Sequence, residues 1–348
     1  MPAETIFRAY DIRGEVPEEL DEEVMERIGK AFGTRLRGGG EGKVVVGRDV
    51  RDSSPELEEA LSRGIASTGV KVLGAGTVPS GPLLFHSREN GLHSAYVTAS
   101  HLPPGNNGVK FARSDGAGYT EEENSEVEKI FQEGEFREGE GKIEDIKVLE
   151  PYRDYLLNSV EVGDIDVLLD PGNGTASLTA PDIFWEAGAE LEVMNGDPEG
   201  SFPNRSSDVT EESLENLREK MEEGEHEAGF AYDGDADRLA VVDDRGRLLS
   251  SEEVAYLALE ELLKEEGGPV VANVECSRLI EDVAEQYGSE VIRTRVGRSY
   301  VFREVMEQGA VLGVESSRHI CIAPLFPLDD GVAVSFYLAS IISGLEEP

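Results

Sequence analysis

Short apolar runs alternate with amphipathic stretches along the chain, and one arrangement of them occurs three times. Each copy has a strand-like apolar run, a helical stretch, a glycine and a second apolar run, over residues 43–73, 166–194 and 269–294. This pattern is typical of a right-handed βαβ unit, in which a glycine ends the helix. The three glycines are Gly69, Gly188 and Gly288.

The copies lie about 100 to 120 residues apart, which is the size of a domain. We therefore predict an α/β fold with three consecutive domains, each a mixed sheet flanked by helices. Three βαβ units of one large sheet are the alternative. The acidic, glycine-bearing stretch 133–142 favours a break, because it can bury little. The predicted domains are residues 1–148, 149–247 and 248–348.

Helical periodicity supports this division. Residues 23–37 and 252–264 each place apolar side chains on one stripe, as a helix packed on a core requires. The acidic stretches 121–133 and 210–225 also have helical patterns, and we interpret them as solvated helices without a site.

The charge balance is strongly acidic, with 72 Asp and Glu against 32 Lys and Arg and a formal net charge of -40. Such a chain repels nucleic acid and anionic membranes. The charge is spread along the whole sequence, which favours a high-salt cytoplasm where salt screens the repulsion, with an ordinary acidic protein as the alternative. We interpret Cys276 and Cys321 as buried thiols in a reducing compartment. Without a signal segment or a membrane-length apolar run, the chain is predicted to be cytoplasmic.

Three carboxylates stand at alternate positions between two apolar runs, at Asp233, Asp235 and Asp237. They repel one another, so a folded chain tolerates them best around a cation, and oxygen ligands favour Mg²⁺ or Ca²⁺ over zinc. Arg238 stands where an EF-hand loop needs glycine, which excludes that motif. The alternative is a polar turn between two strands. Arg238 is a candidate for holding a phosphate.

A candidate nucleophile follows another predicted strand. Ser100 and His101 enter a loop rich in Pro, Gly and Asn, and Lys110 lies beyond it. A serine at a strand end beside a histidine resembles an activated nucleophile, and Lys110 is a candidate general acid or base. The alternatives are a turn serine and a solvated surface lysine.

Two segments carry candidate phosphate-binding groups. Arg8, Tyr10 and Arg13 near the N-terminus suit recognition of a phosphate or sugar, although the segment also fits a strand with an Arg–Asp pair. Residues 47–54 join a predicted strand to a helix, so their amides could meet an anion, or Ser53 or Ser54 could cap the helix.

Of two further loops, one carries candidate sugar-binding groups and the other does not. Glu315, Ser317 and His319 share a loop and can hydrogen-bond vicinal sugar hydroxyls, which is a weak signal alone. Residues 170–175 follow a strand without the glycine spacing of a dinucleotide site, and we interpret them as a tight βα turn.

Taken in order, these segments resemble the signatures of the α-D-phosphohexomutase family, in particular its phosphomannomutase/phosphoglucomutase branch. The matching segments are FRAYDIRG at 7–14, TASHLPPGNNGVKF at 98–111, DGDADR at 233–238 and GVESSRH at 313–319. The resemblance covers essentially the whole chain. It implies an isomerase that moves a phosphoryl group between the 1- and 6-positions of a mannose or glucose phosphate. A bound hexose 1,6-bisphosphate would be the intermediate and activator.

The resemblance also implies a role for each matching residue. Ser100 would be a phosphoserine that gives its phosphoryl group to the sugar and later receives one. Mg²⁺ would be held by the Ser100 phosphate and the three aspartates. Lys110 would move the proton of the sugar hydroxyl, with His101 and Arg13 nearby, and Arg238 would support the phosphoryl group. Glu315 and Ser317 would bind the sugar hydroxyls. The remaining substrate-binding candidates are Arg8, Tyr10, Arg298 and His319.

Three departures from the family pattern bear on activity. Leu102 replaces the usual asparagine after the histidine, and Arg318 replaces the usual glycine in the sugar loop. The sequence stops at Pro348, before the family's fourth domain and its phosphate-binding loop. We therefore expect weak or absent turnover by this chain alone, with phosphorylation of Ser100 retained, unless a second copy or partner chain supplies that loop. The alternatives are a non-catalytic protein that binds sugar phosphates and a Mg²⁺-dependent phosphatase.

Overall fold

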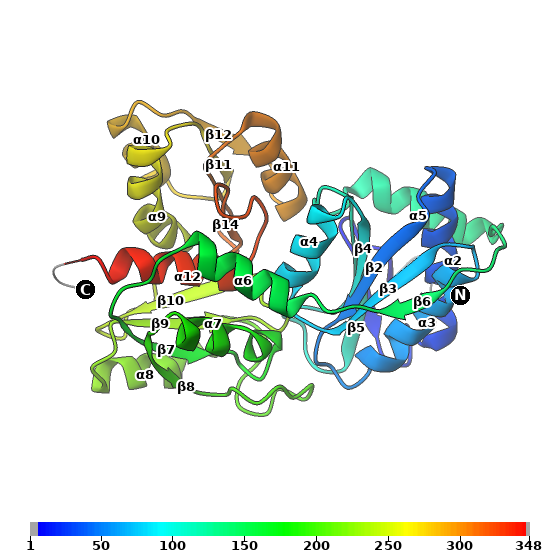
Figure 1. Cartoon of the computed structure of the whole chain (residues 1–348), viewed down its shortest axis with the longest axis horizontal. Coiled ribbons are helices and arrows are strands. Elements are labelled where there is room, and N and C mark those ends of the chain that lie inside the picture. Colours follow the sequence, from blue (N-terminus) through cyan, green and yellow to red (C-terminus); the bar gives the residue numbers. More distant parts are fainter. Residues whose placement is uncertain (1–5, 346–348) are drawn as a thin grey trace. The chain divides into compact units, whose positions relative to one another are not determined.

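The computed structural model describes residues 6–345, which form three β-sheets covered by helices (Figure 1). The chain divides into two compact units. The first runs to Glu150 and includes residues 199–201, and the second holds residues 151–198 and 202 onward.

The first unit contains a six-stranded mixed sheet in the order β1-β5-β4-β2-β3-β6. Its central pairs β4–β2 and β2–β3 are parallel, and β5 pairs antiparallel with both β4 and β1. The strands are β1 (Ile12–Glu15), β2 (Lys43–Arg48), β3 (Lys71–Thr77), β4 (His93–Val97), β5 (Asn106–Ala112) and β6 (Ile143–Asp145). The helices are α2 (Glu22–Gly38), α3 (Ser54–Ala66), α4 (Ser80–Glu89) and α5 (Glu121–Glu133).

Side chains on successive residues of β2 point to opposite faces of this sheet, and both faces are buried. Val44 and Val46 join the larger core, to which Phe32 of α2 contributes, whereas Val45 packs with Leu83 of α4. A sheet covered on both faces explains why β2 is an almost continuous apolar run.

The second unit contains two four-stranded sheets. Their strand orders are β10-β9-β7-β8 and β12-β11-β13-β14. The strands are β7 (Asp166–Asp170), β8 (Glu190–Val193), β9 (Ala228–Tyr232), β10 (Leu239–Asp243), β11 (Val270–Asn273), β12 (Val291–Thr294), β13 (Leu312–Val314) and β14 (Ile320–Ile322). The helices are α6 (Leu149–Ser159), α7 (Ala180–Glu186), α8 (Glu215–Glu223), α9 (Ser251–Glu265), α10 (Leu279–Gln286), α11 (Arg298–Gln308) and α12 (Gly331–Ile342), with a 3₁₀ turn at Thr175–Leu178.

The α/β fold class with mixed sheets is confirmed, and so are the three βαβ units. Strands β2 and β3, β7 and β8, and β11 and β12 are parallel pairs, each joined through a helix. Gly69, Gly188 and Gly288 all have φ between 67° and 92°, and their amides bond to helix carbonyls, as predicted for residues that end a helix.

Two features of the fold were not predicted. The three-residue strand β6 pairs with β3 at the sheet edge, inside a stretch that looks like a linker because it is polar and exposed. Helix α12, at the end of the sequence, packs on the sheet of β7–β10, where Phe336 contacts Phe184 edge-on with ring centres 5.5 Å apart. This contact contributes to making residues after 151 one compact unit.

The cysteine prediction is confirmed in part, since Cys276 and Cys321 are both buried and free. Burial raises the pKa of the Cys276 thiol to about 12, which keeps it protonated and unreactive at neutral pH. Within residues 6–345, no helix combines the length and apolar character that crossing a membrane requires.

Candidate active site

Ser100 lies three residues beyond the end of β4, in the loop that leads to β5, and its side chain is buried. Its φ is 52°, a left-handed conformation that a serine adopts only under constraint. Its amide donates to Thr98 Oγ1 at 2.8 Å, and its carbonyl accepts from Arg51 Nη2 at 2.7 Å. The loop therefore fixes the backbone of the candidate nucleophile.

Lys110 lies within β5 and is only 7% exposed, so the alternative of a solvated surface lysine is wrong. Arg13 of β1 pairs with Gly108 of β5, which places Arg13 and Lys110 on the same face of the sheet. The structure thus brings these two predicted residues together. Arg13 also forms an ion pair of 2.7 Å with Asp11, the arrangement weighed as the alternative for this segment.

The other candidates of the first unit have simpler surroundings. His101 follows Ser100 and is partly buried. Arg8 and Tyr10 precede β1 in a turn, where Arg8 is exposed and Tyr10 is half-buried.

In the segment 47–54, the backbone amides of Arg51 and Ser54 already bond within the protein and are not available to an anion. The amide of Arg51 bonds to Asp49, and that of Ser54 bonds to the carbonyl of Arg51. Ser53 stands at the N-cap position of α3, but its side chain makes no capping hydrogen bond. The Ser54 hydroxyl donates to Asp49 at 2.5 Å.

In the second unit, the three predicted aspartates lie in the hairpin loop between β9 and β10. Asp233, Asp235 and Asp237 are at most 1% exposed, and an oxygen of each lies within 4.8 Å of the others. Oxygen donors at this spacing suit a hard divalent cation, so the residues present fit a metal ion. This geometry does not favour the alternative of an ordinary polar turn, which leaves its carboxylates in water.

The backbone of this metal loop is held by three neighbouring segments. The carbonyl of Gly234 accepts from the amide of Thr175, and the amide of Gly234 donates to Ser207. Gly331 donates to the carbonyl of Ala236, and a side chain at Gly331 would lie 2.8 Å from the Arg238 carbonyl. The predicted tight turn at 170–175 is confirmed, and it supports the metal loop, a role that its sequence did not indicate.

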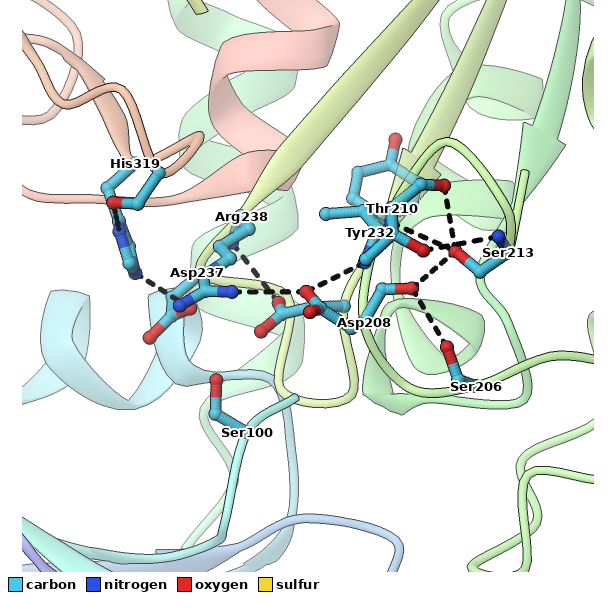
Figure 2. Close-up of polar contacts among 12 residues, drawn as sticks. Ser100, Ser206, Asp208, Thr210, Ser213, Tyr232, Asp237, Arg238 and His319 are labelled. Atoms are coloured by element: carbon cyan, nitrogen blue, oxygen red, sulfur yellow. Dashed lines mark hydrogen bonds and ion pairs between the residues drawn. The ribbon is translucent and has the colours of Figure 1, made fainter. Parts of the chain in front are cut away.

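Two arginines balance part of the charge of the loop. Arg238 donates to Asp208 at 3.1 Å (Figure 2). Arg298 Nη1 lies 2.9 Å from Asp237 and 2.8 Å from Asp329. Burial alone would lower the pKa of both guanidinium groups, but the surrounding aspartates raise it. Arg298 is therefore held in an ion pair with the metal loop, whereas Arg238, at the end of that loop, is held by Asp208.

The sugar-loop candidates lie in the hairpin loop between β13 and β14, in the same unit. His319 Nε2 is 3.3 Å from Asp237 Oδ1, which joins this loop to the metal loop (Figure 2). His319 Nδ1 is 3.0 Å from the Ser317 hydroxyl, and Glu315 accepts from the amide of Gly297 at 2.8 Å. Glu315 is 2% exposed, whereas Ser317 is exposed to solvent.

Several residues of these loops were missed from the sequence. Asp208 and Asp329 bind the two arginines, and Arg205 forms a buried ion pair of 2.7 Å with Asp170. Arg205 also donates to the carbonyl of Tyr232, directly before the metal loop. Only the acidic pair at 329–330 gave a signal, because it precedes an apolar helix in the family pattern.

Comparison with known proteins matches the chain to three consecutive domain families. Residues 4–138, 150–246 and 250–348 match phosphoglucomutase/phosphomannomutase alpha/beta/alpha domains I, II and III. A phosphoglucomutase/phosphomannomutase of Thermococcus kodakarensis is 33% identical over 97% of this chain and 77% of its own length. A Pyrococcus horikoshii protein named "Probable phosphoglucosamine mutase" is 35% identical over 97% and 76%.

A crystal structure of a phosphoglucomutase/phosphomannomutase family protein from Burkholderia thailandensis is also similar. It superposes with a TM-score of 0.94 at 32% identity, covering 100% of this chain and 78% of that one. The chain belongs to the phosphoglucomutase/phosphomannomutase family. The predicted class, a phosphohexomutase-type isomerase, is thereby confirmed, and these comparisons give no support to a non-catalytic protein or a phosphatase.

Proposed function

We propose that this chain transfers a phosphoryl group between the 1- and 6-positions of a hexose phosphate, with Ser100 as the residue that carries it. The observation that supports the proposal most is the buried cluster of Asp233, Asp235 and Asp237. Three adjacent buried carboxylates are stable only when a cation offsets their repulsion. Such a cation is what phosphoryl transfer requires.

We assign the metal-holding role to these three aspartates together with a phosphate on Ser100, and magnesium is the cation that their oxygens suit. When bound, Mg²⁺ would neutralise charge on the transferring phosphoryl group. Two arginines already offset part of the charge of this loop. Arg298 pairs with Asp237, and Arg238 feels the charge of the three aspartates while it pairs with Asp208.

The proposed substrates are the 1- and 6-phosphates of mannose or glucose. Ser100 gives its phosphoryl group to the free hydroxyl, whose proton Lys110 accepts, with His101 and Arg13 beside it. The sugar then remains bound as a 1,6-bisphosphate and returns its other phosphoryl group to Ser100. Lys110 is suited to this role because it is buried on the face of the sheet that it shares with Arg13.

The sugar hydroxyls would be bound by Glu315 and Ser317. Glu315 is oriented by Asn273 and Gly297, and its loop is joined to the metal loop through His319. Arg238 would support the phosphoryl group, and Arg8, Tyr10 and Arg298 would contribute to substrate binding. We also propose that residues 1–148, 149–247 and 248–348 form three separate domains.

A coupled assay of glucose 1-phosphate conversion to glucose 6-phosphate tests it, with Mg²⁺ and a hexose 1,6-bisphosphate activator. We expect wild-type protein to carry one phosphate on Ser100 by intact mass and to turn over only weakly, because the sequence does not include the phosphate-binding loop of the family's fourth domain. Ser100→Ala should lower the rate at least ~10³-fold, because the covalent step is lost. Release of free phosphate at the rate of substrate loss would contradict the proposal, and so would full activity of Ser100→Ala.

A further inference from the structure

A fully buried ion pair of the first unit lies against the loop that carries Ser100. The side chains of Asp49 and Arg51 are both 0% exposed, and Arg51 Nε lies 3.0 Å from Asp49 Oδ2. Removing two charges from water is unfavourable, so a buried pair by itself is weak evidence for a stabilising role. The role of this pair must therefore be sought in the groups that its two side chains bind.

Arg51 uses all five of its N–H groups on the protein. One binds Asp49, and the other four bind backbone carbonyls of residues 100–106, the loop and the first residue of β5, at 2.6–3.1 Å. These carbonyls belong to Ser100, Leu102, Pro103 and Asn106. No N–H remains for a substrate phosphate, so Arg51 acts on the loop and not on a ligand.

Arg51 binds the carbonyl of Ser100, and Asp49 acts on the amide of Ser100 through the Thr98 hydroxyl. Asp49 Oδ2 accepts from the Thr98 hydroxyl at 2.8 Å, and Thr98 Oγ1 in turn accepts from the amide of Ser100. The amide and the carbonyl of Ser100 are thus both fixed by one buried pair. These bonds act on the backbone on both sides of Ser100, whose φ of 52° is strained for a serine.

We propose that Asp49, Arg51 and Thr98 are positioning residues for phosphoryl transfer, which hold the Ser100 hydroxyl in the orientation that in-line attack requires. The inference rests on the proposed role of Ser100. A lysine at position 51 would keep the charge but lose the planar fork that reaches four carbonyls. Valine at position 98 would keep the shape of threonine but lose the hydroxyl that joins Asp49 to the Ser100 amide.

Phosphorylation of Ser100 by α-glucose 1,6-bisphosphate tests the inference, followed by intact mass over a range of bisphosphate concentrations. We expect Arg51→Lys and Thr98→Val to lower the maximal rate about 10- to 100-fold, as small misplacements of a reacting group do. The half-saturating concentration should change less than about threefold, because the groups that bind the sugar are untouched. Thr98→Ser keeps the hydroxyl and should restore the rate.

Arg27→Lys is the matched control. Arg27 also grips a backbone carbonyl, that of Phe131, but in another part of the same unit. It should lose stability without losing rate. Equal rates for Thr98→Val and Thr98→Ser would overturn the inference, and so would an Arg51→Lys protein that is phosphorylated at the wild-type rate. If Arg51→Lys does not fold, the Thr98 pair decides. Wild-type protein that never acquires phosphate would refute the role of Ser100 itself.

Discussion

One residue in each of the three candidate loops has a positive φ although it is not glycine. These residues are Ser100 at 52°, Ala236 at 62° and Arg318 at 73°. Side chains with a Cβ are strained in this region, and such strain is usually stored where a loop must hold a fixed shape. At Ser100 and Ala236 the surrounding hydrogen bonds enforce it.

Arg318 offers a direct measurement of this strain. It stands where the family pattern has glycine, and its side chain donates to the Leu249 carbonyl at 3.0 Å. Replacing it by glycine or alanine removes that bond equally, but only glycine relieves the backbone. We expect Arg318→Gly to be more stable than Arg318→Ala by about 1 kcal/mol, measured by denaturant unfolding. Equal stability of the two variants would show that position 318 is not strained.

At the scale of elements, the hairpin between β9 and β10 concentrates negative charge that only a cation can fully offset. Replacing Asp235 by asparagine should therefore have two effects. Without metal, the variant should be at least as stable as wild type, since one repulsive charge is gone. With Mg²⁺ in excess, the wild-type melting temperature should rise by a few degrees, as ligand binding to the folded state predicts, and that of Asp235→Asn should not.

Asp197→Asn is the control for this experiment. Asp197 is an exposed aspartate of the same unit and lies outside the cluster. Its variant should keep the Mg²⁺-dependent rise. A rise in all three proteins, or in none, would mean that the cluster does not bind Mg²⁺.

At the N-terminus of α12, the buried carboxyl group of Asp330 makes the stability of the fold depend on pH. Asp330 accepts from the Tyr152 hydroxyl at 2.6 Å and from the amides of Val332 and Ala333. Burial raises the pKa of Asp330 to about 6, although these bonds oppose the shift. The protonated carboxyl thus favours the folded state. This contribution is complete below a pH of about 4 and is lost as the pH rises through about 6.

Asp330→Asn removes this titration. We expect the free energy of unfolding of wild type, relative to the variant, to fall by up to about 3 kcal/mol as the pH rises from about 4 to 7. Denaturant unfolding across this range measures the difference, with the exposed Asp164→Asn as a control that should show little change. A difference that stays constant, or that grows with pH, would show that Asp330 is ionised when folded.

At the scale of the whole molecule, the three sheets share one plan. In each sheet, four consecutive strands follow it, and these are β2–β5, β7–β10 and β11–β14. The first two are parallel neighbours, the third pairs parallel with the first, and the fourth returns antiparallel at the side of the third. The larger sheet adds β1 and β6 at its edges. The candidate loops all join the third strand to the fourth. These loops carry Ser100, Asp233 to Asp237, and Glu315 to His319. The same loop position in three copies of one unit thus carries three different sets of functional groups: a serine, a cluster of aspartates and a loop with Glu, Ser and His.

This plan explains which features the sequence could predict. The βαβ units were visible because strand and helix periodicities are local, and the loops because their residue types are unusual. The positioning of these loops depends on contacts between distant residues, such as Arg51 with Ser100 and Arg205 with Tyr232. No local pattern encodes such pairs. The short strand β6 was missed because three exposed residues carry no periodicity.

The net charge of -40 leads to a prediction for the entire chain. Repulsion among so many carboxylates destabilises the folded state. Salt weakens this repulsion, because the screening length falls from about 10 Å at 0.1 M to about 3 Å at 1 M. We expect the melting temperature to rise steadily with KCl up to molar concentrations. A triple variant with Glu135, Glu138 and Glu140 replaced by glutamine, all exposed residues, should start higher in low salt and rise less. A melting temperature that is flat or falls with KCl would contradict the prediction of a high-salt cytoplasm.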